Sequence, residues 1–110
     1  MNSLISPAEL KRLLDGGVSL TVLDVRLIED RSPVDHPIPG AVWRNPDEVE
    51  SWRKEIGAED TVVVYCVHGL RVSQGVCAAL RAQGTRVSYL EGGIEEWGEF
   101  IRSGINEAGA

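Results

Sequence analysis

Hydrophobic residues gather along the chain in short runs that are typical of buried β-strands. Three runs predict strands over residues 18–25, 61–66 and 87–90, and residues 41–43 are a further, brief candidate. The run 61–66 is apolar nearly throughout instead of alternating with polar residues. That pattern is typical of a strand with both faces covered, so we expect residues 61–66 to lie inside a sheet.

Between these runs, hydrophobic residues three and four positions apart predict amphipathic helices. The first helix has a capping-box pattern at residues 6–9, with Pro7 at its first position, and a glycine pair at 16–17 ends it. A second cap pattern opens a short helix that ends near Gly57. Two longer helices are predicted over about residues 71–83 and after the glycine pair 92–93.

Strands and helices thus alternate, which favours an α/β fold around a mostly parallel sheet. A chain of 110 residues fits one compact domain, and we expect its core over about residues 4–102, followed by a short flexible tail. Ligands of open α/β sheets bind at the carboxyl ends of the strands. We expect three loops to meet at that edge: those after Val25, after Cys66 and around residues 91–93.

The segment 27–46 is a long polar connection that holds four of the five prolines. It exceeds the usual length of a loop, which favours a functional or substrate-facing role. His36 within it is interpreted as a loop residue.

Charge and composition narrow the function. The formal net charge of −6 and the presence of only two lysines argue against a nucleic-acid partner. No apolar stretch approaches the ~20 residues that span a membrane, and the N-terminus lacks a signal pattern. Cys66 and Cys77, with only two histidines, form neither a disulfide framework nor a metal site. We therefore expect reduced thiols, no metal, no cofactor and a cytoplasmic protein.

Cys66 is the strongest candidate for chemistry, because it ends a buried strand and precedes a helix that begins at Arg71. A helix N-terminus and an arginine both favour a negatively charged thiolate, the nucleophilic form of cysteine. The loop between the two residues consists of Val67, His68, Gly69 and Leu70. If it wraps around the sulfur, its amides form an anion-binding nest that also stabilises a second sulfur bonded to Cys66. Gly69 permits the backbone conformation that such a nest requires.

Two residues of this loop have open roles. Arg71 either binds an oxyanion donor with two hydrogen bonds or is a surface arginine that pairs with an acidic residue such as Glu91 or Glu95. His68 either donates to a sulfur atom or projects into solvent.

Three residues outside the loop complete the set. Arg26 either binds substrate at the rim or forms a salt bridge. Asp24 is expected to order loops by accepting hydrogen bonds at the sheet edge. Cys77 lies on the apolar side of its helix and is expected in the core.

Four motifs, in this order, resemble the rhodanese homology domain of the single-domain sulfurtransferase type. They are L-D-V-R at residues 23–26, I-P-G-A at 38–41, the strand and Cys-x-x-Gly-x-Arg loop at 62–71, and L-E-G-G-I-E-E-W at 90–97. The resemblance implies a central parallel sheet with helices on both faces. It also implies that Cys66 takes a sulfane sulfur from a thiosulfate- or persulfide-type donor, small or protein-bound. The resulting persulfide passes the sulfur to a cyanide or thiol acceptor.

Details of the loop separate this class from its relatives. Phosphatases and arsenate reductases of the same fold have one more residue between the cysteine and the arginine, so the shorter loop here favours sulfur over phosphate. Val67 and His68 stand where the family frequently has arginine and serine, which leaves the loop less basic. A persulfide donor is therefore at least as plausible as free thiosulfate. The alternatives are a redox-sensing or partner-binding module without enzymatic activity, or a phosphatase or arsenate reductase; the oligomeric state stays open.

Overall fold

Five strands form one sheet at the centre of the molecule. The computed structural model describes residues 4–57, 59–68 and 71–109, with side chains up to residue 104. The sheet order is β1-β5-β4-β2-β3, and all four strand pairings are parallel. The strands are β1 (Leu4–Ile5), β2 (Thr21–Asp24), β3 (Val42–Trp43), β4 (Thr61–Tyr65) and β5 (Arg86–Leu90). The predicted α/β class with a parallel sheet is confirmed.

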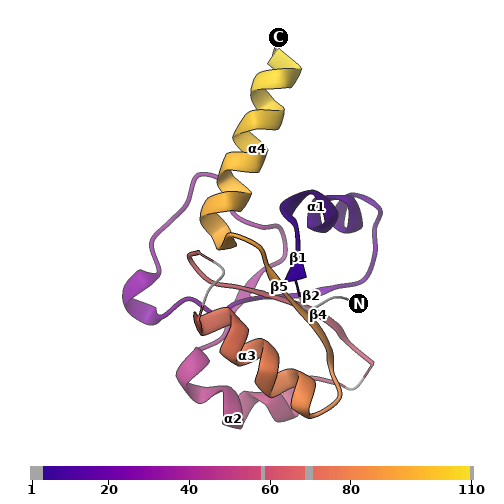
Figure 1. The fold of residues 1–110 in the computed structure, drawn as a ribbon, viewed down its shortest axis with the longest axis vertical. Helices are drawn as coiled ribbons and strands as arrows, with labels where there is room; N and C mark the ends of the chain where they lie inside the picture. Colours follow the sequence, from indigo (N-terminus) through magenta and orange to yellow (C-terminus); the bar gives the residue numbers. More distant parts are fainter. Residues whose placement is uncertain (1–3, 58, 69–70, 110) are drawn as a thin grey trace.

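Helices cover both faces of this sheet, as the resemblance implied (Figure 1). On one face lie α1 (Pro7–Asp15) and α4 (Gly93–Gly109). On the other lie α2 (Val49–Trp52) and α3 (Arg71–Ala82). Short 3-10 turns at Pro46–Glu48 and Arg53–Glu55 flank α2, and another occupies Ile28–Asp30.

The alternation of side chains along β4 explains why this strand is apolar at nearly every position. Val63 and Tyr65 pack toward α1 and α4, whereas Val62 and Val64 pack toward α2 and α3. Successive side chains of a strand point to opposite faces, so a central strand between two helical layers has no polar side. The pattern of residues 61–66 is thus accounted for by packing.

The helix ends follow local signals. The Ser6 side chain accepts a hydrogen bond from the Glu9 amide at 3.1 Å, which confirms the capping box. Past the other end of α1, the amide of Val18 donates to the carbonyl of Leu13 at 3.1 Å. Because the Val18 amide is hydrogen-bonded to the end of α1, it is not part of the sheet. The strand β2 begins only at Thr21, and the predicted strand start at residue 18 is wrong.

Other boundaries also differ from the prediction. The two-residue strand β1 was not predicted, because its pairing with Tyr89 and Leu90 of β5 leaves no local pattern. Cys66 lies just beyond β4, and Gly93 is the first residue of α4. The backbone is helical through Gly109, and the flexible tail expected after residue 102 stays a prediction.

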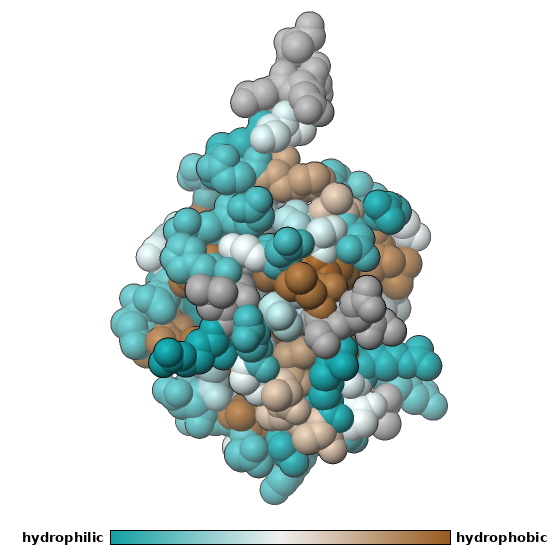
Figure 2. All heavy atoms as spheres, in the orientation of Figure 1, coloured by the Kyte–Doolittle hydropathy of each residue, from teal (hydrophilic) through white to brown (hydrophobic). Residues whose placement is uncertain are grey.

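The surface is consistent with the acidic composition. The face shown in Figure 2 is mostly hydrophilic, in a chain with 17 acidic and 11 basic residues. None of the helices in the described ranges combines the length and apolar character needed to cross a membrane.

The core packing leads to a stability prediction. Leu80 on α3 is fully buried between that helix and the sheet, so Leu80→Ala should lower the free energy of unfolding by about 2–5 kcal/mol. Leu4→Ala is the matched control, because Leu4 is 41% exposed. Urea denaturation measures both; equal effects would contradict this assignment of the core.

Candidate active site at the carboxyl edge of the sheet

The three loops expected at the carboxyl edge of the sheet meet there. The amide of Val25, just after β2, donates to the carbonyl of Tyr65 at 2.9 Å. The amide of Ile94 donates to the carbonyl of Cys66 at 2.9 Å, and that of Glu95 to the carbonyl of Val67 at 3.3 Å. This part of the prediction is confirmed.

The contact between α4 and Cys66 requires glycine at position 93. Gly93 has a φ of 64°, and a Cβ there would lie 2.4 Å from the carbonyl oxygens of both Cys66 and Val67. Only a residue without a side chain permits this approach. The first amides of α4, which have no partner within the helix, therefore bind the backbone of the loop. The sequence showed the glycine pair but not this role.

The sulfur of Cys66 faces a polar side-chain atom inside the protein. Cys66 is only 6% exposed, and its thiol donates to the Ser73 hydroxyl, with 3.3 Å between Sγ and Oγ. Ser73 is the third residue of α3 and is fully buried. Sequence reasoning did not select it as a site residue. Its signal is a serine on the same helix face as the buried residues Val76, Cys77 and Leu80.

The remaining loop residues are only partly described. His68 is exposed, and its Nδ1 lies 3.8 Å from a carboxylate oxygen of Glu95 on α4. Arg71 begins α3 and is exposed. Gly69 and Leu70 lie outside the described residues, so the anion-binding nest stays a prediction.

Asp24 and Arg26 form a buried ion pair at the end of β2. The guanidinium of Arg26 donates to both carboxylate oxygens of Asp24, at 2.8 Å to Oδ2 and 3.1 Å to Oδ1. The Arg26 amide adds a bond to Oδ1 at 3.0 Å. The side chains are only 8% and 10% exposed, respectively. The hydrogen bonds to Asp24 raise the pKa of Arg26 above its ordinary value and outweigh the opposing effect of burial.

The same arginine holds the long connection after β2. Its side chain donates to the carbonyl of Ser32 at 3.0 Å, and its own carbonyl accepts a bond from the Trp43 indole at 2.9 Å. The guanidinium of Arg31 lies over the Trp43 ring, 4.5 Å from its centroid. Arg26 is thus engaged in the salt bridge that was one of its two predicted roles, and its geometry gives no support to substrate binding.

Two buried titratable side chains are held in their neutral forms, one beside this edge and one in the core. Burial, and then the negative charge of Asp24, raise the pKa of Tyr65, so its phenol stays protonated next to Cys66 in the chain. Burial also raises the pKa of Cys77, which lies in the core as expected and keeps its thiol protonated. Both cysteines are free.

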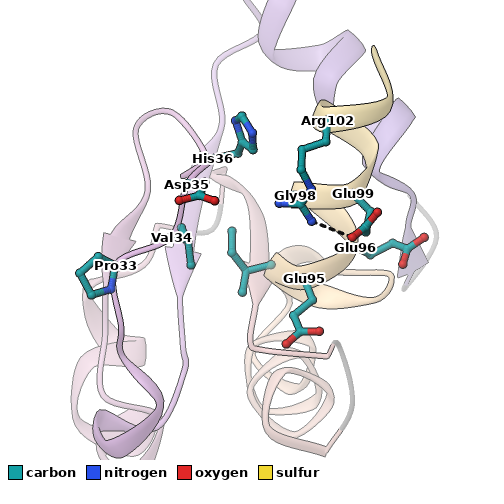
Figure 3. A pocket seen from close by; sticks show the side chains of 10 residues that line it. Pro33, Val34, Asp35, His36, Glu95, Glu96, Gly98, Glu99 and Arg102 are labelled. Carbon is teal, nitrogen blue, oxygen red and sulfur yellow. Dashed lines mark hydrogen bonds and ion pairs between the residues drawn. The ribbon is translucent and has the colours of Figure 1, made fainter. Parts of the chain in front are cut away.

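A cavity of about 370 Å³ opens between the long connection and α4 (Figure 3). Glu95, which reaches His68, is part of its wall, so the cavity adjoins the Cys66 loop. Among the described residues, four carboxylates line it, and Arg102 is bound to one of them, Glu99, at 2.8 Å. The charged lining residues are Asp35, Glu95, Glu96, Glu99 and Arg102. The long connection therefore faces a strongly acidic cavity beside the Cys66 loop.

Comparison with known proteins defines the class to which this fold and site belong. The family model of the rhodanese-like domain matches residues 6–100. The chain therefore belongs to the family of rhodanese-like domains, and the predicted resemblance is confirmed.

Individual relatives agree with this assignment. The chain is 31% identical to YtwF of Bacillus subtilis, whose name includes the term sulfurtransferase, over 84% of this chain and 87% of that protein. It is 30% identical to MoeZ of Mycobacterium tuberculosis, named as an adenylyltransferase/sulfurtransferase, over 91% of this chain. The match spans only 26% of that protein's length.

Solved structures show the same architecture. A rhodanese-like domain protein from Staphylococcus aureus superposes with a TM-score of 0.76 and 26% identity, covering 88% of this chain and 92% of that one. A rhodanese-related protein from Thermoplasma volcanium gives a TM-score of 0.71 and 25% identity, with 94% of each chain covered. These findings support a sulfurtransferase-type role at the level of the family.

The glycine contact generates a stability prediction. Gly93→Ala should lower the free energy of unfolding by about 3 kcal/mol or more, because it places a Cβ against two carbonyl oxygens at positive φ. Gly104→Ala, in the same helix with open space around it, should be neutral or slightly stabilising. Chemical denaturation of both variants is the measurement, and a Gly93→Ala protein as stable as the parent would refute the contact.

The buried ion pair generates another prediction. Arg26→Met should cost about 3–5 kcal/mol of stability, because the Asp24 carboxylate is left buried without its partner. Adding Asp24→Asn should recover part of that loss. Lys11→Met removes the exposed pair with Asp15 and should change stability by less than about 1 kcal/mol. If Arg26→Met leaves stability intact but impairs substrate binding, the rim role is correct instead.

Proposed function

We propose that this protein is a sulfurtransferase that carries sulfane sulfur as a persulfide on Cys66. The observation that supports it best is the position of this thiol. Cys66 follows the central strand at the carboxyl edge of the sheet, its backbone is held by α4, and the helix that begins at Arg71 follows it. A helix N-terminus and a nearby guanidinium stabilise a thiolate and an anionic persulfide alike.

The reaction has two displacements. In the first, the thiolate of Cys66 attacks the outer sulfur of a donor; the donor's bond to that sulfur breaks, and its electron pair leaves with sulfite or with the donor thiolate. In the second, cyanide or a thiolate attacks the outer sulfur of the Cys66 persulfide. The S–S bond breaks, thiocyanate or a new persulfide departs, and the electron pair returns to Cys66 as thiolate.

The charges around the site favour a persulfide donor over free thiosulfate. Val67 supplies no positive charge beside the cysteine, and Glu95 stands next to the exposed His68. The adjoining cavity adds further carboxylates. A dianion such as thiosulfate is repelled by this surround, whereas a thiol-borne persulfide carries less charge. We extend the proposal to small or protein-bound persulfides as donors, and to the reducing cytoplasm as the location where both thiols stay free.

Intact mass spectrometry tests this function. Incubation with cysteine persulfide should add one sulfur atom, and cyanide should remove it. Cys66→Ser should abolish the gain, whereas Cys77→Ser should retain it because Cys77 is buried and protonated. Thiosulfate should load the protein more slowly than the persulfide.

Other outcomes identify the alternatives. A gain of sulfur that persists in Cys66→Ser sinks the assignment. Sulfenic acid at Cys66 under low peroxide, without loading by any donor, indicates a redox sensor. Hydrolysis of an aryl phosphate that depends on Cys66 indicates a phosphatase.

A further inference from the structure

Ser73 is a polar residue in a place where packing alone would favour an apolar one. It is fully buried, on the helix face that it shares with Val76, Cys77 and Leu80. A buried hydroxyl is costly unless it is hydrogen-bonded. Here its oxygen lies 3.3 Å from the sulfur of Cys66, the atom that reacts in the proposed function.

We propose that Ser73 is a further catalytic residue, whose hydroxyl donates a hydrogen bond to the Cys66 sulfur whenever that sulfur is a thiolate. The inference rests on the proposed function for its role in turnover. Its effect on the thiolate itself is independent of any sulfur donor.

A hydroxyl suits this task because it is both a donor and an acceptor and can rotate about its C–O bond. With Cys66 protonated, the thiol donates to the Ser73 oxygen, as in the structure. When the thiol loses its proton, the hydroxyl turns and donates to the sulfur across the same distance. Hydrogen bonds to charged acceptors are roughly twice as strong as neutral ones, so the thiolate gains more than the thiol loses.

The same bond acts selectively within the catalytic cycle. In the loaded protein, the negative charge resides on the outer sulfur, one bond away from Sγ. When an acceptor thiolate attacks that outer sulfur, the S–S bond breaks and the electron pair moves to Sγ. Ser73 then stabilises the departing Cys66 thiolate, and a better-stabilised thiolate leaves faster. The residue thus promotes formation of the nucleophile and delivery of the sulfur.

The test is the pH dependence of Cys66 alkylation by iodoacetamide, measured in the full chain with Cys77→Ser as background. Ser73→Ala should move the midpoint of the rate profile upward by about one pH unit, which is about a tenfold smaller thiolate fraction at neutral pH. Ser73→Thr keeps a hydroxyl and should restore the parental midpoint. Ser88→Ala removes another fully buried serine hydroxyl, on β5, and should leave the midpoint unchanged.

Sulfur delivery gives a second readout. Discharge of the preloaded persulfide by cyanide should be about tenfold slower in Ser73→Ala at neutral pH. If Ser73→Ala does not fold, Ser73→Thr and Ser73→Val form a pair of equal shape that differs only in the hydroxyl, and the midpoint difference between them decides.

The outcomes separate the two proposals. A folded Ser73→Ala protein with the parental alkylation midpoint overturns the role of Ser73, whatever its sulfur chemistry. A shifted midpoint in a protein that accepts no sulfur from any donor supports the hydrogen bond and overturns the proposed function. A midpoint that shifts equally in Ser88→Ala also overturns it, because the effect is then a general result of losing a buried hydroxyl.

Discussion

The carbonyl groups of Cys66 and Val67 are held by the first amides of α4, and the approach is possible because residue 93 has no side chain. This contact joins the strand that delivers the thiol to the helix that covers one face of the sheet. The first amides of α4, which have no acceptors within the helix, donate hydrogen bonds here. These bonds hold the start of the loop after β4 in place. The position of the Cys66 backbone and the side of the acidic cavity that α4 forms both depend on this contact.

A second support of the edge is electrostatic. Asp24 and Arg26, two residues apart, make a buried pair that also binds the carbonyl of Ser32 and, through its backbone, the indole of Trp43. A long connection with little regular structure needs such internal bonds to keep one conformation. The charged groups of Asp24 and Arg26 are therefore occupied with each other and with the connection that forms one wall of the cavity.

Much of this was readable from the sequence, for physical reasons. The doubly buried strand, the capping box of α1 and the thiol at the strand end are encoded by neighbours in the chain, so local patterns predict them. Gly93 and Ser73 acquire their roles from contacts across the fold, and nothing near them in sequence states which backbone or sulfur they will meet. Arg26 shows the same limit: its residue type suits both a rim and a salt bridge, and only burial distinguishes them. The two-residue β1 exists solely through its pairing with β5.

The pairing of β1 with β5 and the hold of α4 on Cys66 also affect how the protein is made. A ribosome releases the cysteine well before residues 93–95, and the first strand emerges long before the partner with which it pairs. Chains grow from the N-terminus slowly compared with local folding. In this domain, however, β1 cannot pair and the loop after β4 cannot be held until β5 and the start of α4 have been made. A chain that ends before residue 93 therefore lacks the bonds that hold the backbone of Cys66 and Val67, and the candidate site is assembled only when synthesis of the domain is complete.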